Sequence, residues 1–118
     1  MLVRIDPGAA TPLHAQIGAG IRRAIAQGEV ADGHRLPAAR ELAEGLQVNV
    51  HTVLRAYAAL RDEHLIELRR GRGAVVRAGE PERARLALAG HVRELVEQAR
   101  RRGVPDEEVV DMVRRAQC

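Results

Sequence analysis

The stretch AARELAEGLQVNVHTVLRAYAALRD, residues 38–62, predicts two short helices joined by a tight turn. In the second helix Asn49 can cap the N-terminus, and the apolar residues Val53, Tyr57 and Leu60 follow at the i, i+4 and i+7 spacing of one buried face. At about 100° per residue, the opposite face carries His51, Arg55, Ala58 and Asp62. A helix with an apolar back and a polar, partly basic front suits a DNA groove. The stretch therefore predicts a helix-turn-helix motif.

The chain before this motif predicts a core helix. Thr11 and Pro12 are favoured as cap and first residue, and Gly28 supplies the stop. The apolar residues on one face are Leu13, Ile17, Ile21, Ala24 and Ile25. Near its polar side, Arg22 and Arg23 allow two interpretations: contact with DNA phosphates, or a solvated face. A turn and a short extended piece then lead to Pro37 and the motif.

The sequence LIELRRGRGAVVRAG, residues 65–79, predicts a β-hairpin after the motif. Two apolar runs, residues 65–68 and 74–76, flank a tip made of Arg69, Arg70, Gly71, Arg72 and Gly73. Glycine lets the backbone approach DNA closely, while the arginines reach phosphates or a narrow minor groove. A hairpin in this position is a wing. The alternative is an edge hairpin that only adds solubility.

With these elements in place, residues 12–76 resemble the winged-helix domain of the GntR family of bacterial transcription regulators. The stretch Asn49 to Tyr57, followed by a short tail, looks most like the YtrA subfamily. The resemblance implies a mainly α fold with a small β-hairpin, in which a winged helix-turn-helix domain at 1–79 precedes a two-helix tail at 80–118. The family's DNA contacts would fall on Arg40, Asn49, His51, Thr52, Arg70, Gly71 and Arg72. The helical-wheel argument adds Arg55.

Some positions depart from the family's pattern. Ala38 stands where many members have a capping serine, and Gln47 stands where they have a turn glycine. A residue with a side chain is thus expected at positive φ there, at a cost of about 1 kcal/mol. Val50 replaces a base-reading arginine, so it cannot grip guanine but could touch a thymine methyl group. The resemblance therefore implies the docking geometry but no operator sequence.

The tail predicts two amphipathic helices, over residues 82–102 and from Pro105 onward. Two helices of this size cannot enclose a core, so their apolar faces need a partner. A second copy of the tail is favoured because twofold symmetry matches a palindromic site. The predicted dimerisation residues are Leu86, Val92, Leu95, Val96, Val109 and Val113. A tail this short leaves little room for an effector pocket, and no effector is identified.

The charge distribution agrees with a DNA-binding N-terminal part. Residues 1–79 hold 11 Arg against 8 acidic residues, a balance of +3, whereas residues 80–118 hold 8 of each, a balance of 0. Every basic residue among the Lys and Arg is arginine. This use of arginine could reflect bidentate recognition of phosphate or guanine, or the codon bias of a GC-rich genome.

Other features argue against an enzyme, a metal site or a cofactor. The five histidines lie far apart, no serine occurs, and the one cysteine, Cys118, ends the sequence. No apolar run approaches the ~20 residues of a membrane span, so a soluble, cytoplasmic protein is expected. The predicted function is a sequence-specific transcriptional regulator, of the repressor type, that binds double-stranded DNA as a homodimer. Two alternatives remain: a non-specific architectural DNA-binding protein, and a winged-helix protein-interaction module.

Overall fold

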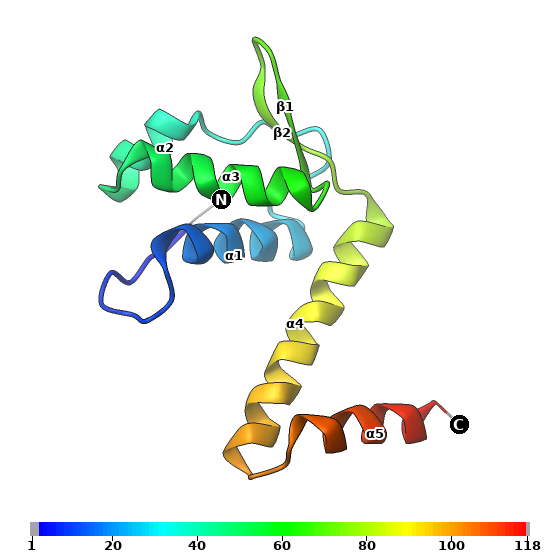
Figure 1. Cartoon of the computed structure of the whole chain (residues 1–118). Coiled ribbons are helices and arrows are strands. Elements are labelled where there is room, and N and C mark those ends of the chain that lie inside the picture. Colours follow the sequence, from blue (N-terminus) through cyan, green and yellow to red (C-terminus); the bar gives the residue numbers. More distant parts are fainter. Residues whose placement is uncertain (1–2, 118) are drawn as a thin grey trace. The chain divides into compact units, whose positions relative to one another are not determined.

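The computed structural model of the chain describes residues 3–117 and shows two compact units, residues 1–86 and 87–118. The elements in chain order are α1 (Leu13–Ala26), α2 (Ala39–Leu46), α3 (Val50–Asp62), β1 (Ile66–Arg69), β2 (Gly73–Val76), α4 (Glu80–Arg101) and α5 (Asp106–Ala116) (Figure 1). The mainly helical fold with one hairpin is the predicted fold class. The boundary between the two units falls inside α4, so the first turns of that helix belong to the first unit.

The first unit has its core where α1 and α2 pack against α3 and the base of the hairpin. Figure 1 shows α1 and α3 side by side, with the hairpin rising from the C-terminal half of α3 on the side away from α1. The largest fully buried side chains are Ile17, Ile21, Ile25, Val53, Leu60, Ile66 and Val76. Burial of an aliphatic side chain of this size stabilises a fold by about 1.5–3 kcal/mol. The predicted apolar faces of α1 and α3 are therefore confirmed as the core, except that Leu13 at the start of α1 is only half-buried.

The start of α1 differs from its prediction by one residue. Pro12, not Thr11, occupies the cap position, and no side chain caps the helix. The carbonyl of Pro12 instead accepts hydrogen bonds from the backbone amides of Ala15 and Gln16, each at 3.1 Å. The end is as predicted, because Gly28 follows the helix at φ 77°.

The turn between α2 and α3 has the predicted strained residue. Gln47 adopts the left-handed conformation at φ 57° and ψ 46°, and the amide of Val48 donates to the carbonyl of Ala43 at 3.0 Å. Asn49 caps α3 as predicted, since its Oδ1 accepts a hydrogen bond from the backbone amide of His51 at 2.8 Å. The helix-turn-helix is thus fixed at both sides of its turn.

The hairpin is held at its base by a third extended segment. β1 and β2 are antiparallel, with Ile66 opposite Val76 and Arg69 opposite Gly73. On the other edge of β2, the amide of Leu36 donates to the carbonyl of Ala74 at 2.8 Å, and the amide of Val76 donates to the carbonyl of His34 at 2.7 Å. The piece before Pro37 was predicted as extended, but not as a partner of β2. This pairing fixes the inner strand of the hairpin on both sides.

The first turns of α4 are fastened to the first unit. Arg83 Nε donates to the carbonyl of Ile25 at the end of α1, at 3.3 Å, and Leu86 packs against the core. Just before the helix, the amide of Ala78 donates to Asp32 Oδ1 at 3.0 Å. Leu86, which was predicted as a dimerisation residue, therefore packs against the core of the first unit.

The second unit is a helical hairpin made of the end of α4 and α5. Gly103 turns the chain at φ 75°, and the amide of Val104 donates to the carbonyl of Ala99 at 2.9 Å. Ala99 and Val109 are buried where the two helices meet, and Arg100 pairs with Asp106 at 3.1 Å. The predicted last helix after Pro105 is therefore present, and its first apolar residue packs inside the hairpin.

Candidate nucleic-acid interface

Helix α3 presents the predicted polar front opposite its buried back. His51 and Arg55 are exposed and Thr52 is half-buried, while Val53 and Tyr57 lie in the core. Within residues 3–117, Arg55 forms no ion pair, so its guanidinium group remains available for an anion or a base.

Asn49 is more constrained than the sequence indicates. Its Oδ1 is committed to the amide of His51, which leaves only the side-chain NH₂ group to donate to a ligand. The predicted DNA contact by this residue is therefore restricted to a hydrogen-bond acceptor, such as a phosphate oxygen or a purine N7.

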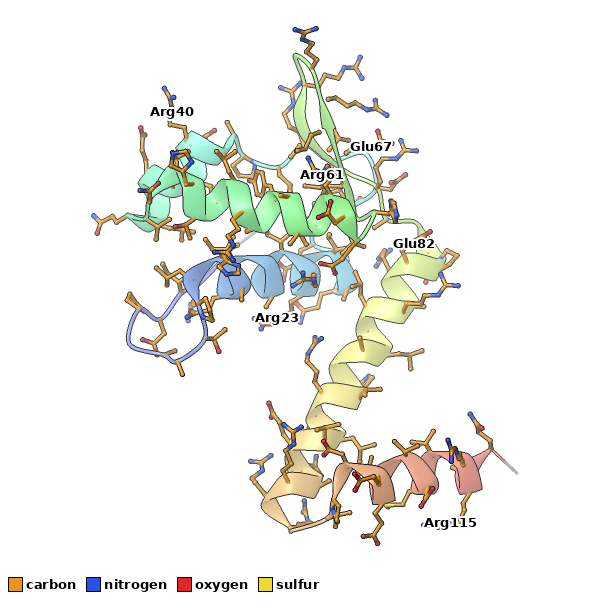
Figure 2. The ribbon with its side chains drawn as sticks, in the orientation of Figure 1. Arg23, Arg40, Arg61, Glu67, Glu82 and Arg115 are labelled. Atoms are coloured by element: carbon orange, nitrogen blue, oxygen red, sulfur yellow. The ribbon has the colours of Figure 1, made fainter. Side chains whose placement is uncertain are left out.

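Arg40 stands on the outer side of α2. Figure 2 shows its side chain pointing away from α1, toward the side on which the hairpin projects. It is exposed and makes no ion pair with any described residue. Arg40 thus adds a free positive charge from a second element of the helix-turn-helix.

The four arginines in and beside the hairpin fall into two pairs. Glu67 on β1 accepts from Arg69 at 2.8 Å and lies 3.6 Å from Arg77, so it offsets the charge of both. Arg70 and Arg72 occupy the loop itself, are exposed, and form no ion pair among residues 3–117. Glu67, which pairs with these two arginines, precedes the arginine run and was not predicted as part of the tip.

Glycine is required at the tip because the loop turns through positive φ. Gly71 and Gly73 have φ values of 81° and 71°, a conformation that residues with side chains rarely adopt. Between them Arg72 is held by a hydrogen bond from its amide to the carbonyl of Arg69, at 3.1 Å. The alternation of Arg and Gly thus builds a tight loop that points two free guanidinium groups outward.

The arginine pair on α1 has other roles. Arg22 makes a two-pronged ion pair with Glu63, the residue that follows α3, and so links the ends of the two helices. Arg23 lies on the side of α1 turned away from α3 (Figure 2). The phosphate-contact interpretation is thus not favoured for either residue.

Tyr57 fixes the angle at which the chain enters α2. Its buried side chain donates a hydrogen bond from the hydroxyl to the carbonyl of Pro37 at 2.6 Å. Burial, helped by the negative charge of Glu41, raises the pKa of Tyr57 to about 12. The phenol therefore remains protonated and keeps donating at any physiological pH.

Val50 and Leu54 occupy different environments on α3. Val50, considered for contact with a thymine methyl group, is half-buried and packs against the core. Leu54, one turn later, is 47% exposed on the flank of α3 that faces the hairpin, and Leu68 of β1 is also 47% exposed. Neither leucine was predicted as a site residue from the sequence, although Leu54 interrupts the otherwise polar outer surface of the helix.

The predicted dimerisation residues fall into two groups. Val92, Leu95 and Val113 are exposed, at 56%, 41% and 47%. The other three are less exposed. Leu86 packs against the core of the first unit, Val109 is buried in the tail hairpin, and Val96 is half-buried. The free apolar surface of the tail is therefore carried by the exposed group, which also includes Leu88, Val110 and Met112.

Within residues 3–117, no three His, Cys, Asp or Glu side chains come together in a way that would hold a metal ion. Neither α4 nor any other helix of these residues has the length and hydropathy that a membrane crossing requires.

Comparison with known proteins identifies the family. Residues 13–76 match the family "Bacterial regulatory proteins, gntR family". The chain is 37% identical over 75 residues to the HTH-type transcriptional repressor YtrA of Bacillus subtilis, a match that covers 64% of this chain and 58% of that protein. The chain thus spans little more than half the length of this relative.

Solved structures share the fold. YtrA from Sulfolobus acidocaldarius, a GntR-family transcription factor, superposes with a TM-score of 0.64 at 34% identity, over 84% of this chain and 97% of that one. The DNA-binding domain of AraR in complex with operator ORX1 superposes with a TM-score of 0.56 at 27% identity, over 62% and 90% of the two chains. The matched family consists of regulators, not enzymes. The chain therefore belongs to the GntR family of bacterial regulatory proteins, and its N-terminal part is the winged helix-turn-helix domain of a DNA-binding transcriptional regulator.

Proposed function

We propose that this protein is a transcriptional repressor that binds a specific palindromic operator as a homodimer in the cytoplasm. The observation that carries the proposal is the set of exposed, unpaired arginines on three elements of one DNA-binding domain: Arg40 on α2, Arg55 on α3, and Arg70 with Arg72 in the hairpin loop. The match to an operator-bound AraR domain and to a relative named as a repressor supports it.

In this proposal α3 enters the major groove with its N-terminal turns. His51, Thr52 and Arg55 face the base edges, and the NH₂ group of Asn49 donates to an acceptor near the helix start. Arg40 and the loop arginines bind flanking phosphates, and Gly71 lets the loop backbone approach the duplex. Sequence is thus selected by α3, whereas α2 and the hairpin fix its register.

The homodimer in this proposal forms through the tail. Its exposed apolar side chains, 41–62% accessible, are Leu88, Val92 and Leu95 on α4 and Val110, Met112 and Val113 on α5. So many exposed apolar side chains on a small unit indicate a protein partner. A second tail offers a matching apolar surface by symmetry, and twofold symmetry suits two half-sites one helical turn of DNA apart.

The test begins with a duplex that the full-length protein enriches from a random-sequence pool. Anisotropy titrations at two salt concentrations compare this duplex with its shuffled version. A specific regulator prefers the enriched duplex by about 10³ or more. Equal, salt-sensitive binding to both duplexes would instead identify an architectural protein, and no binding would favour a protein-interaction module.

Single substitutions then test the docking mode. Arg40→Ala and Arg72→Ala are expected to weaken binding about tenfold and to lower the slope of log affinity against log salt by about 0.9 each, since each removes one phosphate contact. Arg93→Ala, an exposed arginine on α4, is the matched control. Unchanged affinity and slope for both test variants would exclude the assigned docking.

A further inference from the structure

Arg83, in the first turn of α4, lies across the end of α1. Its Nε donates a hydrogen bond to the carbonyl of Ile25 at 3.3 Å, and its Nη1 lies 3.6 Å from the carboxylate of Glu80. The carbonyl groups in the last turn of a helix carry partial negative charge, so a guanidinium group is well suited to this place. Arg83 thus joins the start of α4 to the C-terminus of α1.

Gly28 leaves the space that this arginine occupies. A Cβ atom at residue 28 would lie 2.6 Å from Nη2 of Arg83, which is closer than side-chain atoms approach one another in folded proteins. Among residues 3–117, five glycines have positive φ, and Gly28 is the one where an added Cβ would meet another group within 4 Å. The glycine therefore serves the contact with Arg83 as well as the end of α1.

Two backbone hydrogen bonds hold the segment that leads into α4. The amide of Ala78 donates to Asp32 Oδ1 at 3.0 Å, and the amide of Arg77 donates to the carbonyl of Leu65 at 2.8 Å. Ala78 is only 2% exposed, so the loss of either partner would leave a shielded polar group without a hydrogen bond. Together with Arg83, these contacts reach the end of α1, the turn that follows it, and the residue before β1. The first turn of α4 is thus fastened to the body that carries α3.

We propose that this junction, with Arg83 as its positioning residue, sets the half-site spacing that the dimer accepts on DNA. The inference rests on the proposed function, in which α3 reads a half-site and the tail forms the dimer. Because α4 is one helix from Glu80 to Arg101, the chain between α3 and the tail runs through this junction. Each base pair added between two half-sites moves one of them by about 3.4 Å and turns it by about 35°. A firm junction resists that change, whereas a loosened junction follows it at a lower peak affinity.

The test measures the affinity of the full-length protein as a function of half-site spacing. The repeat shared by the duplexes that the wild type enriches defines the half-site. Test duplexes carry two copies at the enriched spacing, two copies with one or two base pairs added or removed, or a single copy. The wild type is expected to prefer the enriched spacing by at least about tenfold. Arg83→Ala is expected to reduce this preference to about threefold or less, with single-copy affinity unchanged within about twofold.

Matched variants separate the junction from a general effect on the fold. Arg83→Lys keeps a cation that can reach the last carbonyls of α1, so it is expected to restore part of the spacing preference. Gly28→Ala places a Cβ where the guanidinium group lies and is expected to reproduce the loss. Arg85→Ala removes an exposed arginine from the same helix and is expected to leave the preference unchanged.

Asp32 gives a second, independent way to loosen the junction. Asp32→Ala removes the acceptor of the Ala78 amide and is expected to lower the spacing preference, whereas Asp32→Asn keeps an acceptor oxygen and is expected to retain it. Circular dichroism and sedimentation verify that each variant is folded and dimeric. If Gly28→Ala did not fold, Arg83→Ala and Asp32→Ala would still decide the question.

Four outcomes would overturn the inference. An unchanged spacing preference in Arg83→Ala and Asp32→Ala would leave the junction a role in stability alone. A wild type that bound all spacings equally, yet bound the single half-site specifically, would refute the junction's role and leave the proposed function standing. Weaker single-copy binding by Arg83→Ala, with a salt slope lower by about 0.9, would make Arg83 a phosphate contact. If the wild type enriched no duplex, the proposed function itself would fail, and this inference with it.

Discussion

The two units of the chain differ in how much apolar surface each buries by itself. In the first unit, seven large aliphatic side chains are less than 2% exposed. Among the described residues of the second unit, the buried apolar residues are Ala99 and Val109, whereas six other apolar side chains remain 41–62% exposed. Because apolar burial is the main force that holds a fold together, the first unit is expected to be stable alone, and the second to depend on a partner.

The largest expected effect comes from the core of the first unit. Leu60→Ala removes a side chain that is fully buried between α3 and its neighbours, and is expected to lower the free energy of unfolding by about 2–5 kcal/mol. Val110→Ala, on a side chain that is 49% exposed in the single chain, is expected to change it by less than about 0.5 kcal/mol at protein concentrations too low for dimerisation. Urea unfolding followed by circular dichroism compares the two, and similar losses would remove the contrast between the units.

The next effect concerns the partner of the second unit. The double variant Val92→Asp with Leu95→Asp places charges on the exposed face of α4, so self-association is expected to weaken by at least about 100-fold. Sedimentation velocity should then report one-chain mass, with Glu94→Gln as the control that retains the dimer. A persistent dimer in the double variant would exclude this face.

Val109→Asp separates the tail's internal packing from its association. The sequence alone predicts a dimerisation role for Val109, but the side chain is buried in the tail hairpin. We therefore expect this variant to lose helical circular dichroism signal as well as the dimer's mass. Substitutions on the exposed face are expected to change the mass alone. A monomer with full helical content would return Val109 to the dimer interface.

The elements that the sequence predicted well are those whose signals are local. The i, i+4, i+7 spacing of Val53, Tyr57 and Leu60, the cap at Asn49 and the glycines of the hairpin loop each act within a few residues. The strained turn at Gln47 was expected for another reason, because the resembled family carries a turn glycine at this position.

The features that the sequence did not reveal depend on residues distant along the chain. Residues 33–36 pair with β2, about forty positions later, and Glu63 binds Arg22. Leu54 and Leu68 belong to separate elements, so they come to line one groove with the start of α2 only in the folded chain. Composition and periodicity carry no information on such pairings.

A smaller effect is expected from the buried phenol of the first unit. Tyr57 is the one tyrosine of the chain, so absorbance of the tyrosinate form reports on it alone. Its pKa in the folded protein is raised to about 12, against about 10 in the unfolded chain. The folded state therefore holds the proton more tightly, and the stability from this group is complete below pH 10 and declines as pH rises from 10 toward 12.

Spectrophotometric titration tests this directly. The midpoint in the native protein should lie near 12 and should fall toward 10 in concentrated urea. Tyr57→Phe should lose the alkaline decline in stability along with the hydrogen bond to Pro37. A native midpoint near 10 would show that the phenol is not enclosed and that the entry to α2 is held by other contacts.

The smallest expected effect concerns the backbone strain at Gln47, which the first unit tolerates because its core is strong. Gln47 is held at φ 57°, where a residue with a side chain costs about 1 kcal/mol relative to glycine. Gln47→Gly is therefore expected to stabilise the protein by up to about 1 kcal/mol, whereas Glu44→Gly, inside α2, should destabilise it by about 1 kcal/mol. Opposite signs in urea unfolding would locate the strain in the turn. Equal losses would mean that Gln47 makes contacts that outweigh its backbone conformation, and that the first unit is less self-sufficient than its core indicates.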